Sequence, residues 1–103
     1  MTFKAMILLT RRDDMTHEAF IQWWTTEHAP LARQLPGVRE IRFNDVEQGD
    51  GAICDGITEL WFDSREDFDA AYSTPIGQVV AADSLAHVTS RVRVMVSEHR
   101  ITP

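Results

Sequence analysis

The sequence is poor in cysteine and has no long apolar run. Cys54 is the single cysteine among 103 residues, so no internal disulfide can form, as is typical of proteins in a reducing cytosol. The longest uninterrupted apolar run, Ala5–Leu9, is far shorter than the roughly 20 residues of a membrane-spanning helix. The sequence contains no basic segment followed by an apolar core, so no signal peptide is expected. We therefore expect a cytoplasmic protein with no membrane partner.

Positive charge is also scarce. The chain has 10 Lys and Arg against 16 Asp and Glu, a net charge of -6, which would repel phosphate backbones, so no nucleic acid partner is expected. The glycines at 49–51 do not form the GxGxxG pattern of a dinucleotide loop. His17 and His28 would lie about 16 Å apart along a helix, and His17 is expected to be a surface residue of the first helical turn. His87 and His99 have no neighbours at ligand spacing. We expect neither a cofactor nor a metal.

What the chain does contain is ordinary for one globular domain spanning residues 1–103. Hydrophobic residues make up 44% and charged residues 25%, and no repeat or low-complexity tract divides the sequence. A chain of this length can build a core, but its surface is large relative to its volume. Association with a second subunit would relieve that imbalance.

Periodicity predicts alternating strands and helices. We expect strands at 3–9, 38–44 and 57–62, with a last one within 91–101, and a loop at 45–56. Helices are expected within 15–38, at 65–72 and from 74 to about 83. Ser64 is expected to cap the second of these, and Thr74, followed by Pro75, the third. The order βαββαβ matches the split βαβ motif, an α+β fold with a four-stranded antiparallel-containing sheet and helices on one face. In this interpretation the first and third strands are parallel neighbours at the sheet centre.

The stretch Met15–Val38 is the longest helical pattern. Thr16 is expected to cap its start, and Pro36-Gly37 to end it. Pro30 lacks an N–H for the carbonyl of Thr26, so the helix should kink or restart just after His28. At about 100° per residue, the apolar residues of this helix fall on one face: Phe20, Ile21, Trp24, Leu31 and Leu35. His28 lies on the same face.

His28 is the candidate catalytic residue. Imidazole titrates near neutrality, so a histidine in an apolar pocket can accept and return a proton. Phe20, Trp24 and Leu31 would line this pocket and bind a small apolar or aromatic molecule. The alternative is a core histidine bonded to the carbonyl that Pro30 leaves free.

Two further candidates lie on one face of the strand at 57–62. Trp61 is either a packing residue or part of the substrate pocket, and Glu59 is a buried carboxylate that needs a partner. Arg42 and Arg93 are the candidate partners. Glu59 is therefore either one half of an ion pair or a catalytic acid. No Ser-His-Asp or Cys-His set can be assembled from spacing alone.

Three blocks of sequence resemble the EthD family, named after a gene of ethyl tert-butyl ether degradation. They are MTHEAFIQWWTTEHAPLARQLPGV at 15–38, DGITELWFDS at 55–64, and STP at 73–75 followed by VAAD at 80–83. The resemblance implies a ferredoxin-like chain that dimerises into an α+β barrel. Relatives include methylmuconolactone isomerases, polyketide cyclases and fungal dehydratases. In them a histidine at the position of His28 is implicated in proton transfer.

The chain also departs from its catalytic relatives, which often carry a tyrosine or second histidine on or after the second strand. Here that region is EIRFN at 40–44, with no histidine before Cys54. The first hypothesis is a cofactor-independent isomerase, cyclase or dehydratase with His28 as general base. The alternatives are a non-catalytic accessory or ligand-binding protein that supports an oxygenase, and a small monooxygenase or haem-binding protein. Because the first and third strands are apolar on both sides, a homodimer joined through sheet faces is expected.

Overall fold

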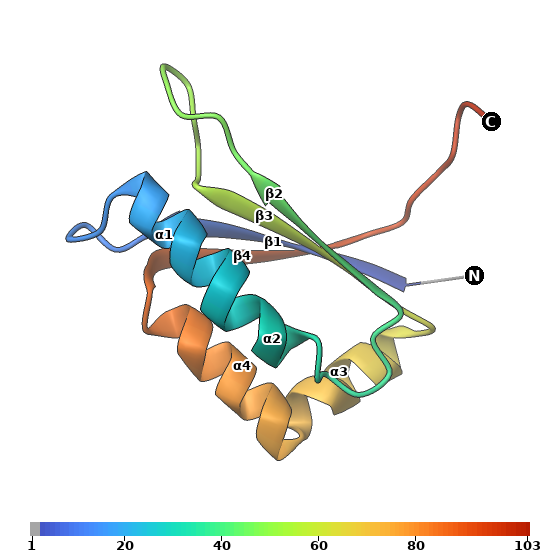
Figure 1. Ribbon diagram of the computed structural model, residues 1–103. Helices are drawn as coiled ribbons and strands as arrows, with labels where there is room; N and C mark the ends of the chain where they lie inside the picture. The colour runs from blue at the N-terminus through green and yellow to red at the C-terminus, as the bar shows by residue number, and fades with distance from the viewer. Residues whose placement is uncertain (1–2) are drawn as a thin grey trace.

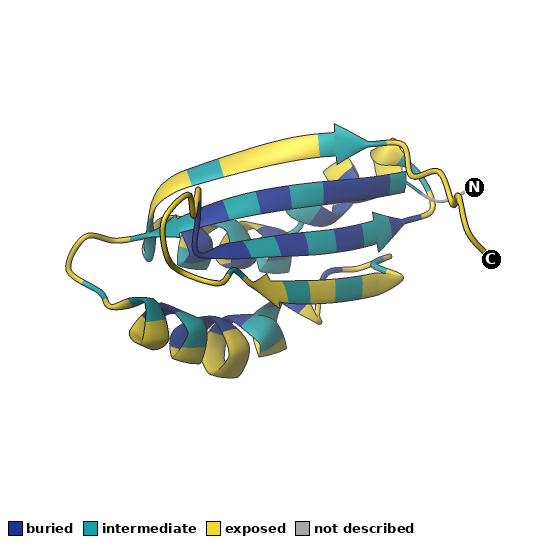
Figure 2. Cartoon of the chain, turned by 90° about the horizontal axis from the view of Figure 1, so that it is seen from above, coloured by how far each residue is buried: buried dark blue, intermediate teal, exposed yellow. Residues whose placement is uncertain are grey.

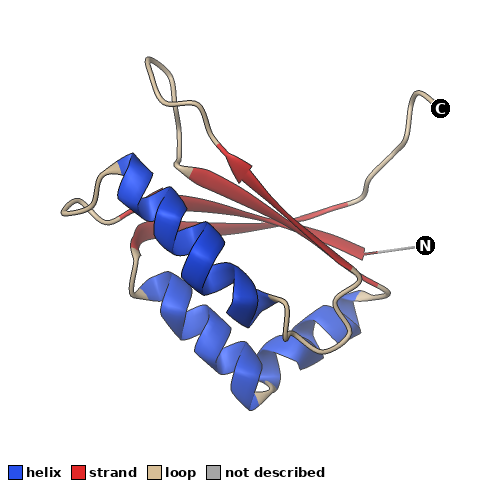
Figure 3. Ribbon diagram, in the orientation of Figure 1, coloured by secondary structure: helices blue, strands red, loops and turns tan. Residues whose placement is uncertain are grey.

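The computed structural model describes residues 3–103, and in it four strands form one sheet with all helices on one side (Figures 1 and 3). The strands are β1 (Phe3–Arg11), β2 (Glu40–Asp45), β3 (Gly56–Phe62) and β4 (Val88–Val96). The helical elements are α1 (His17–Trp23), the π-helical turn η1 (Trp24–His28), α2 (Ala29–Ala32), α3 (Arg65–Ser73) and α4 (Pro75–Leu85). The sheet order is β2-β3-β1-β4. This confirms the predicted α+β, ferredoxin-like chain with helices on one face.

The two central strands are β1 and β3, as predicted, but they run antiparallel and not parallel. Phe3 pairs with Phe62 and Leu9 with Gly56, and every other neighbouring pair of strands is antiparallel as well. The helical connection returns the chain to the end of the sheet where β1 began, so β2 runs in the direction of β1. The chain then reverses and inserts β3 between them, antiparallel to both.

Helix starts follow the capping residues that the sequence predicts. The hydroxyl of Thr16 accepts a hydrogen bond from the Ala19 N–H at 3.1 Å. Ser64 accepts from Asp67 at the start of α3, and Thr74 accepts from Gly77 at the start of α4, where Pro75 occupies the first helical position. Local sequence therefore determines where each of these helices begins.

The core lies between the sheet and the helices. Strand alternation directs one set of side chains toward α1, α3 and α4, where they are buried: Ala5, Ile7, Leu9, Leu60 and Phe62. Phe20, Trp24 and Phe68 fill the space from the helix side and are fully buried. In Figure 2 the two central strands carry the buried positions, whereas the edge strands are mostly exposed or intermediate.

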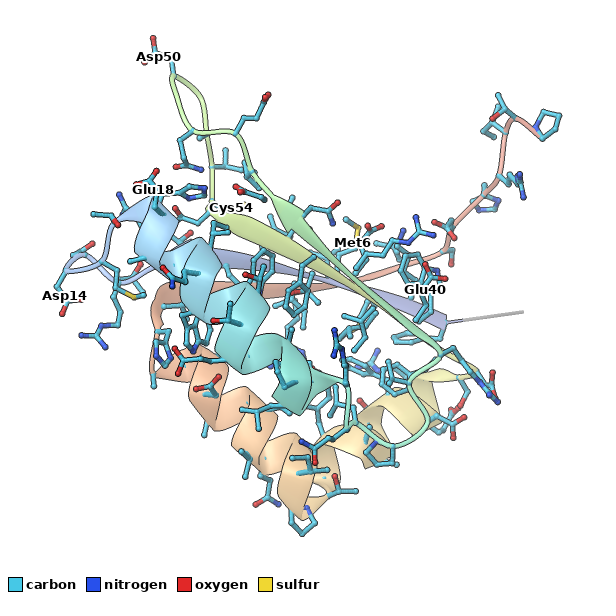
Figure 4. All side chains as sticks on the ribbon, viewed as in Figure 1. Met6, Asp14, Glu18, Glu40, Asp50 and Cys54 are labelled. Carbon is cyan, nitrogen blue, oxygen red and sulfur yellow. The ribbon has the colours of Figure 1, made fainter. Side chains whose placement is uncertain are left out.

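The other sheet face has no helix over it and is largely apolar. Val92 is 50% exposed and Val94 41% exposed on this face of β4. The register places them beside Leu8 and Met6 of β1, the latter labelled in Figure 4. We call this surface the open face; its apolar members are Met6, Leu8, Ile57, Trp61, Val92, Val94 and Val96.

A charged cluster interrupts the apolar surface of the open face. Lys4 is buried and its ammonium pairs with Glu59 at 2.7 Å and Glu98 at 2.8 Å, while it lies 4.6 Å from the centre of the Trp61 ring. Lys4, and neither Arg42 nor Arg93, is thus the ion-pair partner of Glu59. Lys4 lies on the neighbouring strand β1. The sequence pattern of β3 alone does not reveal how β1 is aligned with it, so this partner was not predicted. Within residues 3–103, no helix is long and apolar enough to cross a membrane.

Candidate functional site

The helix that carries His28 changes its winding at that residue. Over η1 the backbone bonds from residue i to i+5, and the N–H of Ala29 donates to the carbonyl of Trp24. This widened turn directly precedes Pro30, which cannot donate to the i−4 carbonyl of a regular helix. The predicted disturbance near Pro30 is therefore present as a π turn. Such turns occur often at functional sites.

The widened turn changes which tryptophan accompanies His28. In a regular helix Trp24, four residues earlier, shares the histidine's face, but an i to i+5 turn aligns His28 with Trp23 instead. The ring of Trp23 lies 5.1 Å from that of His28. Trp24 is instead stacked on Phe43 at 4.3 Å and lies so close to Gly56 that no Cβ would fit there.

His28 is buried and bonded through both ring nitrogens. Nδ1 lies 2.8 Å from Oδ2 of Asp83, and Nε2 lies 3.3 Å from the hydroxyl of Ser84, both residues of α4. The carboxylate accepts the Nδ1–H, which leaves the lone pair on Nε2 to accept from the serine hydroxyl. The tautomer with a basic Nε2 is therefore the one that this environment favours.

The environment also lowers the pKa of His28. Burial is the main cause, because it disfavours the charged imidazolium, and the neighbouring His87 and Arg91 act in the same direction. The hydrogen bond and charge of Asp83 oppose the change without cancelling it. The imidazole is neutral at physiological pH, which is the state that a general base requires.

His87 completes the polar cluster at the end of α4. Its Nδ1–H donates to the backbone carbonyl of Asp83 at 2.7 Å, and its ring stacks on Trp23 with 4.0 Å between ring centres. The side chains of Asp83 and His87 are 23% and 25% exposed, whereas that of His28 is 7% exposed. The imidazole of His28 thus reaches solvent on the side of α4, through partly exposed polar groups.

Ser84, His28 and Asp83 have the connectivity of a Ser-His-Asp triad, which spacing alone did not reveal. Ser84 is only 6% exposed, however, and His28 only 5%. A nucleophilic serine must meet a substrate carbonyl. We therefore interpret Ser84 as a hydrogen-bond partner of Nε2 and not as a nucleophile.

The residues predicted to line a pocket at His28 do not all lie together in the structure. Phe20 and Trp24 are fully buried core residues, and Leu31 is partly buried against the core. Glu59 and Trp61 lie on the open face, because they pair with Met6 and Lys4, whose side chains point away from the helices. A pocket that contains His28 in one chain therefore excludes Glu59 and Trp61. The sheet lies between them.

The aromatic residue that lies between His28 and a surface hollow is Phe43. Its ring lies 6.2 Å from that of His28 and also lines a hollow of about 320 Å³ beside β2 and α2. The hollow has an apolar floor and a charged rim, formed by Ala29, Arg33, Val38, Arg39, Glu40, Ile41 and Phe43. The sequence pattern did not single out Phe43 as a site residue, although its place on the helix side of an alternating strand indicated an inward ring.

His17 has a different environment from the first-turn surface position expected for it. Its Nδ1 lies 2.8 Å from Asp55 and its Nε2 2.7 Å from Asp45, so the start of α1 is tied to the ends of two strands. Burial opposes the charged form, but the bonds to the two carboxylates outweigh it and raise the pKa of His17. Figure 4 labels Glu18 and Cys54 at this end of the molecule. Within residues 3–103, no group of three or more histidine, cysteine or acidic residues is arranged to hold a metal ion.

The four-stranded antiparallel sheet with its helices on one face defines a ferredoxin-like α+β protein. The EthD domain model matches residues 12–90, and the chain belongs to the EthD family. An EthD family protein from Bacillus halodurans superposes with a TM-score of 0.83 at 22% identity, covering 96% of this chain and 100% of that one.

Other similar proteins share the fold at lower identity. SnoaB of Streptomyces nogalater, described as a cofactor-independent oxygenase, has a TM-score of 0.72 at 12% identity, with 99% of this chain and 97% of that one covered. A dimeric ferredoxin-like protein of unknown function from Thermobifida fusca has a TM-score of 0.77 at 17% identity, with 95% and 92% covered.

One relative among curated proteins is similar in sequence. An uncharacterized 11.0 kDa protein of Rhodococcus erythropolis, in the thcB-thcC intergenic region, is 30% identical over 67 residues. The match covers 63% of this chain and spans 65% of the length of that relative.

Proposed function

We propose that this protein is a cofactor-independent proton-transfer enzyme of isomerase, cyclase or dehydratase type, with His28 as the general base. The observation that supports it most directly is the 2.8 Å contact between His28 Nδ1 and Asp83. A carboxylate that accepts the Nδ1–H fixes the ring and strengthens the opposite nitrogen as a base. Nε2 is then the atom that takes the proton, and the hydroxyl of Ser84 gives way to the substrate.

The substrate in this proposal is a small apolar or aromatic molecule. Trp23 and Phe43 provide flat surfaces within 5.1 Å and 6.2 Å of the imidazole, as measured between ring centres. A weakly polar site keeps His28 neutral and weakens the hydration of the reacting groups. The reaction requires a movement that opens the buried imidazole to the ligand. The predicted cytoplasmic location suits a catabolic or biosynthetic role of this kind.

Incorporation of solvent deuterium tests the proposed activity without knowledge of the natural product. Lactones and aromatic β-diketones carry acidic C–H bonds, and NMR in D2O measures their exchange with and without the protein. We expect the wild type to accelerate exchange in at least one of these compounds and His28→Gln to lose about 100-fold or more of that acceleration. His99→Gln is the matched control, because His99 is exposed. Acceleration that survives His28→Gln would rule out His28 as the base.

Two alternative functions each have one supporting observation. A non-catalytic accessory or ligand-binding role is favoured because His28 is only 5% exposed and both of its ring nitrogens are bonded within the chain. A small monooxygenase is favoured by the fold shared with SnoaB, described as a cofactor-independent oxygenase. Oxygen consumption during incubation with an exchanging substrate separates the monooxygenase from an isomerase. Ligand binding without exchange or oxygen uptake indicates the accessory.

We also propose that two copies associate through their open faces into a dimeric α+β barrel. The support is the apolar surface of β1, β3 and β4 that no helix of the same chain covers, including Val92 and Val94. Burial of such surface is worth about 25 cal/mol per Å², so contact with a second copy removes a substantial cost. Ferredoxin-like proteins from Thermobifida fusca and Bacteroides fragilis are described as dimeric. Sedimentation at micromolar concentration tests the oligomeric state.

A further inference from the structure

Strand β4 presents its charged residues to the helices and its valines to the open face. Arg91 pairs with Leu9 and Arg93 with Ile7, and both of these β1 residues point into the core. The intervening Val92 is half exposed on the opposite side of the sheet. An edge strand with one buried face normally has the reverse pattern. Two arginines thus occupy positions on the helix side of the sheet where apolar side chains are usual.

Arg93 has partners within the chain. Its guanidinium lies 4.7 Å from the ring centre of Phe68 and 5.3 Å from that of Tyr72. Cation–π contacts of this kind stabilise an arginine at the edge of an aromatic cluster. The inward orientation of Arg93 is therefore accounted for by packing.

Arg91 differs from Arg93, because it is half-buried and pairs with no carboxylate within residues 3–103. No hydrogen bond of its guanidinium with another described residue is found either. Burial lowers the pKa of Arg91, and the charge of Arg91 in turn helps to lower that of His28. A half-buried cation without a counter-ion is costly unless something negative compensates it.

The position of Arg91 relates this charge to the candidate site. It lies three residues after Val88, near the start of β4. This end of the strand comes shortly after His87 and the partly exposed Asp83 in the chain. This is the side on which polar groups connect His28 with solvent. Arg91 and the end of α4 therefore lie at the same end of the sheet.

We propose that Arg91 is the anion-binding residue of this site, and that the ligand is a small aromatic compound carrying an anionic oxygen, as carboxylate, enolate or phenolate. The inference rests on the proposed function for its reaction but not for its binding. In the reaction, the C–H bond of the substrate breaks, and the proton forms an N–H bond at Nε2 of His28. The electron pair moves onto the adjacent carbonyl oxygen, where the guanidinium compensates the charge, and return of the proton at another carbon completes an isomerisation without an oxidant.

The test measures binding of benzoate and of neutral benzamide by quenching of tryptophan fluorescence and by calorimetry. We expect benzoate to bind the wild type more tightly than benzamide. Arg91→Gln should weaken benzoate binding about tenfold or more, because it removes a charge-assisted contact. Arg33→Gln is the matched control: Arg33 is an exposed arginine at the rim of the hollow beside β2. It should leave the affinity for benzoate within about twofold of the wild type.

Arg91→Met provides a second variant that keeps an unbranched apolar stem and removes the charge. Without ligand, both variants should unfold at or above the wild-type temperature, because a half-buried cation without a partner is removed. A fall in the unfolding temperature with unchanged benzoate affinity would show that Arg91 has a structural role and would overturn the proposal. Equal affinity for benzoate and benzamide, no binding of either, or an equal loss in Arg33→Gln would overturn it as well.

His28→Gln separates this inference from the proposed function. Benzoate should still bind that variant, since the anion is bound by Arg91, whereas proton exchange should be lost. Retained exchange in His28→Gln together with a tenfold loss of benzoate affinity in Arg91→Gln refutes the base and leaves the anion site standing. The converse result refutes the anion site alone.

Discussion

Replacement of His17 by glutamine should destabilise the fold more than its place in the first helical turn suggests. Asp55 is 3% exposed, and its carboxylate is contacted by His17 at 2.8 Å, by the Arg11 N–H at 2.9 Å and by the Arg11 guanidinium at 3.5 Å. Loss of a hydrogen bond to a buried charge costs about 1.5–3 kcal/mol. The bond to Asp45, whose side chain is 59% exposed, adds no more than about 1 kcal/mol.

The destabilisation should depend on pH in a defined direction. The folded state raises the pKa of His17 above its usual value near 6.5. Protonated His17 therefore stabilises the folded state fully below that usual value, and this contribution is lost as the pH rises through the folded-state pKa. The difference in unfolding free energy between wild type and His17→Gln should be largest at mildly acidic pH and should shrink toward alkaline pH.

Denaturant unfolding followed by circular dichroism at pH 6 and at pH 9 measures both quantities. At the lower pH we expect a difference of about 2–3 kcal/mol, which for a domain of this size shifts the unfolding temperature by roughly 8–20 °C. His99→Gln, at an exposed position, controls for the loss of a histidine as such. A difference that is absent, or that grows with pH, would refute the imidazolium bridge between the two carboxylates.

Three further outcomes follow from particular contacts. Asp83→Asn removes the charge that raises the pKa of His28, so an NMR titration of the His28 ring should move to lower pH; an unmoved titration would show that the pair is not coupled. Gly56→Ala should cost about 1–3 kcal/mol of unfolding free energy, because a Cβ there would lie 2.5 Å from the ring of Trp24. Trp24→Phe should reduce the penalty of that substitution, and an unchanged penalty would contradict the clash. Val94→Asp should shift sedimentation from dimer to monomer with the fold retained, whereas a persistent dimer would contradict the open-face interface.

The fold could be predicted from the sequence because its main signals are local. Alternation and apolar runs mark the strands, and the hydroxyls of Thr16, Ser64 and Thr74 mark the helix starts, where the structure confirms each cap. Strand direction is a different kind of property. It depends on how the connections cross the sheet, and the interpretation of the first and third strands as parallel was wrong for that reason.

The candidate site was less predictable because its contacts join distant parts of the chain. Asp83 and Ser84 meet His28 from α4, at sequence separations of 55 and 56 residues, and no helical or strand period connects them. The companion aromatic residue was misassigned for a local reason. A constant 100° per residue selects Trp24, whereas the π turn that accommodates Pro30 brings Trp23 to the imidazole.

The two histidines of this helical stretch show why the partners of an imidazole, more than its place on a helix face, decide what it can do. Both nitrogens of His17 meet carboxylates, so both must donate, and the ring is held as a cation with a raised pKa. His28 meets one carboxylate and one hydroxyl, and burial lowers its pKa. A serine can donate where a carboxylate cannot, so Nε2 of His28 keeps a lone pair that can accept a proton. Of the two, only His28 has the protonation state of a general base.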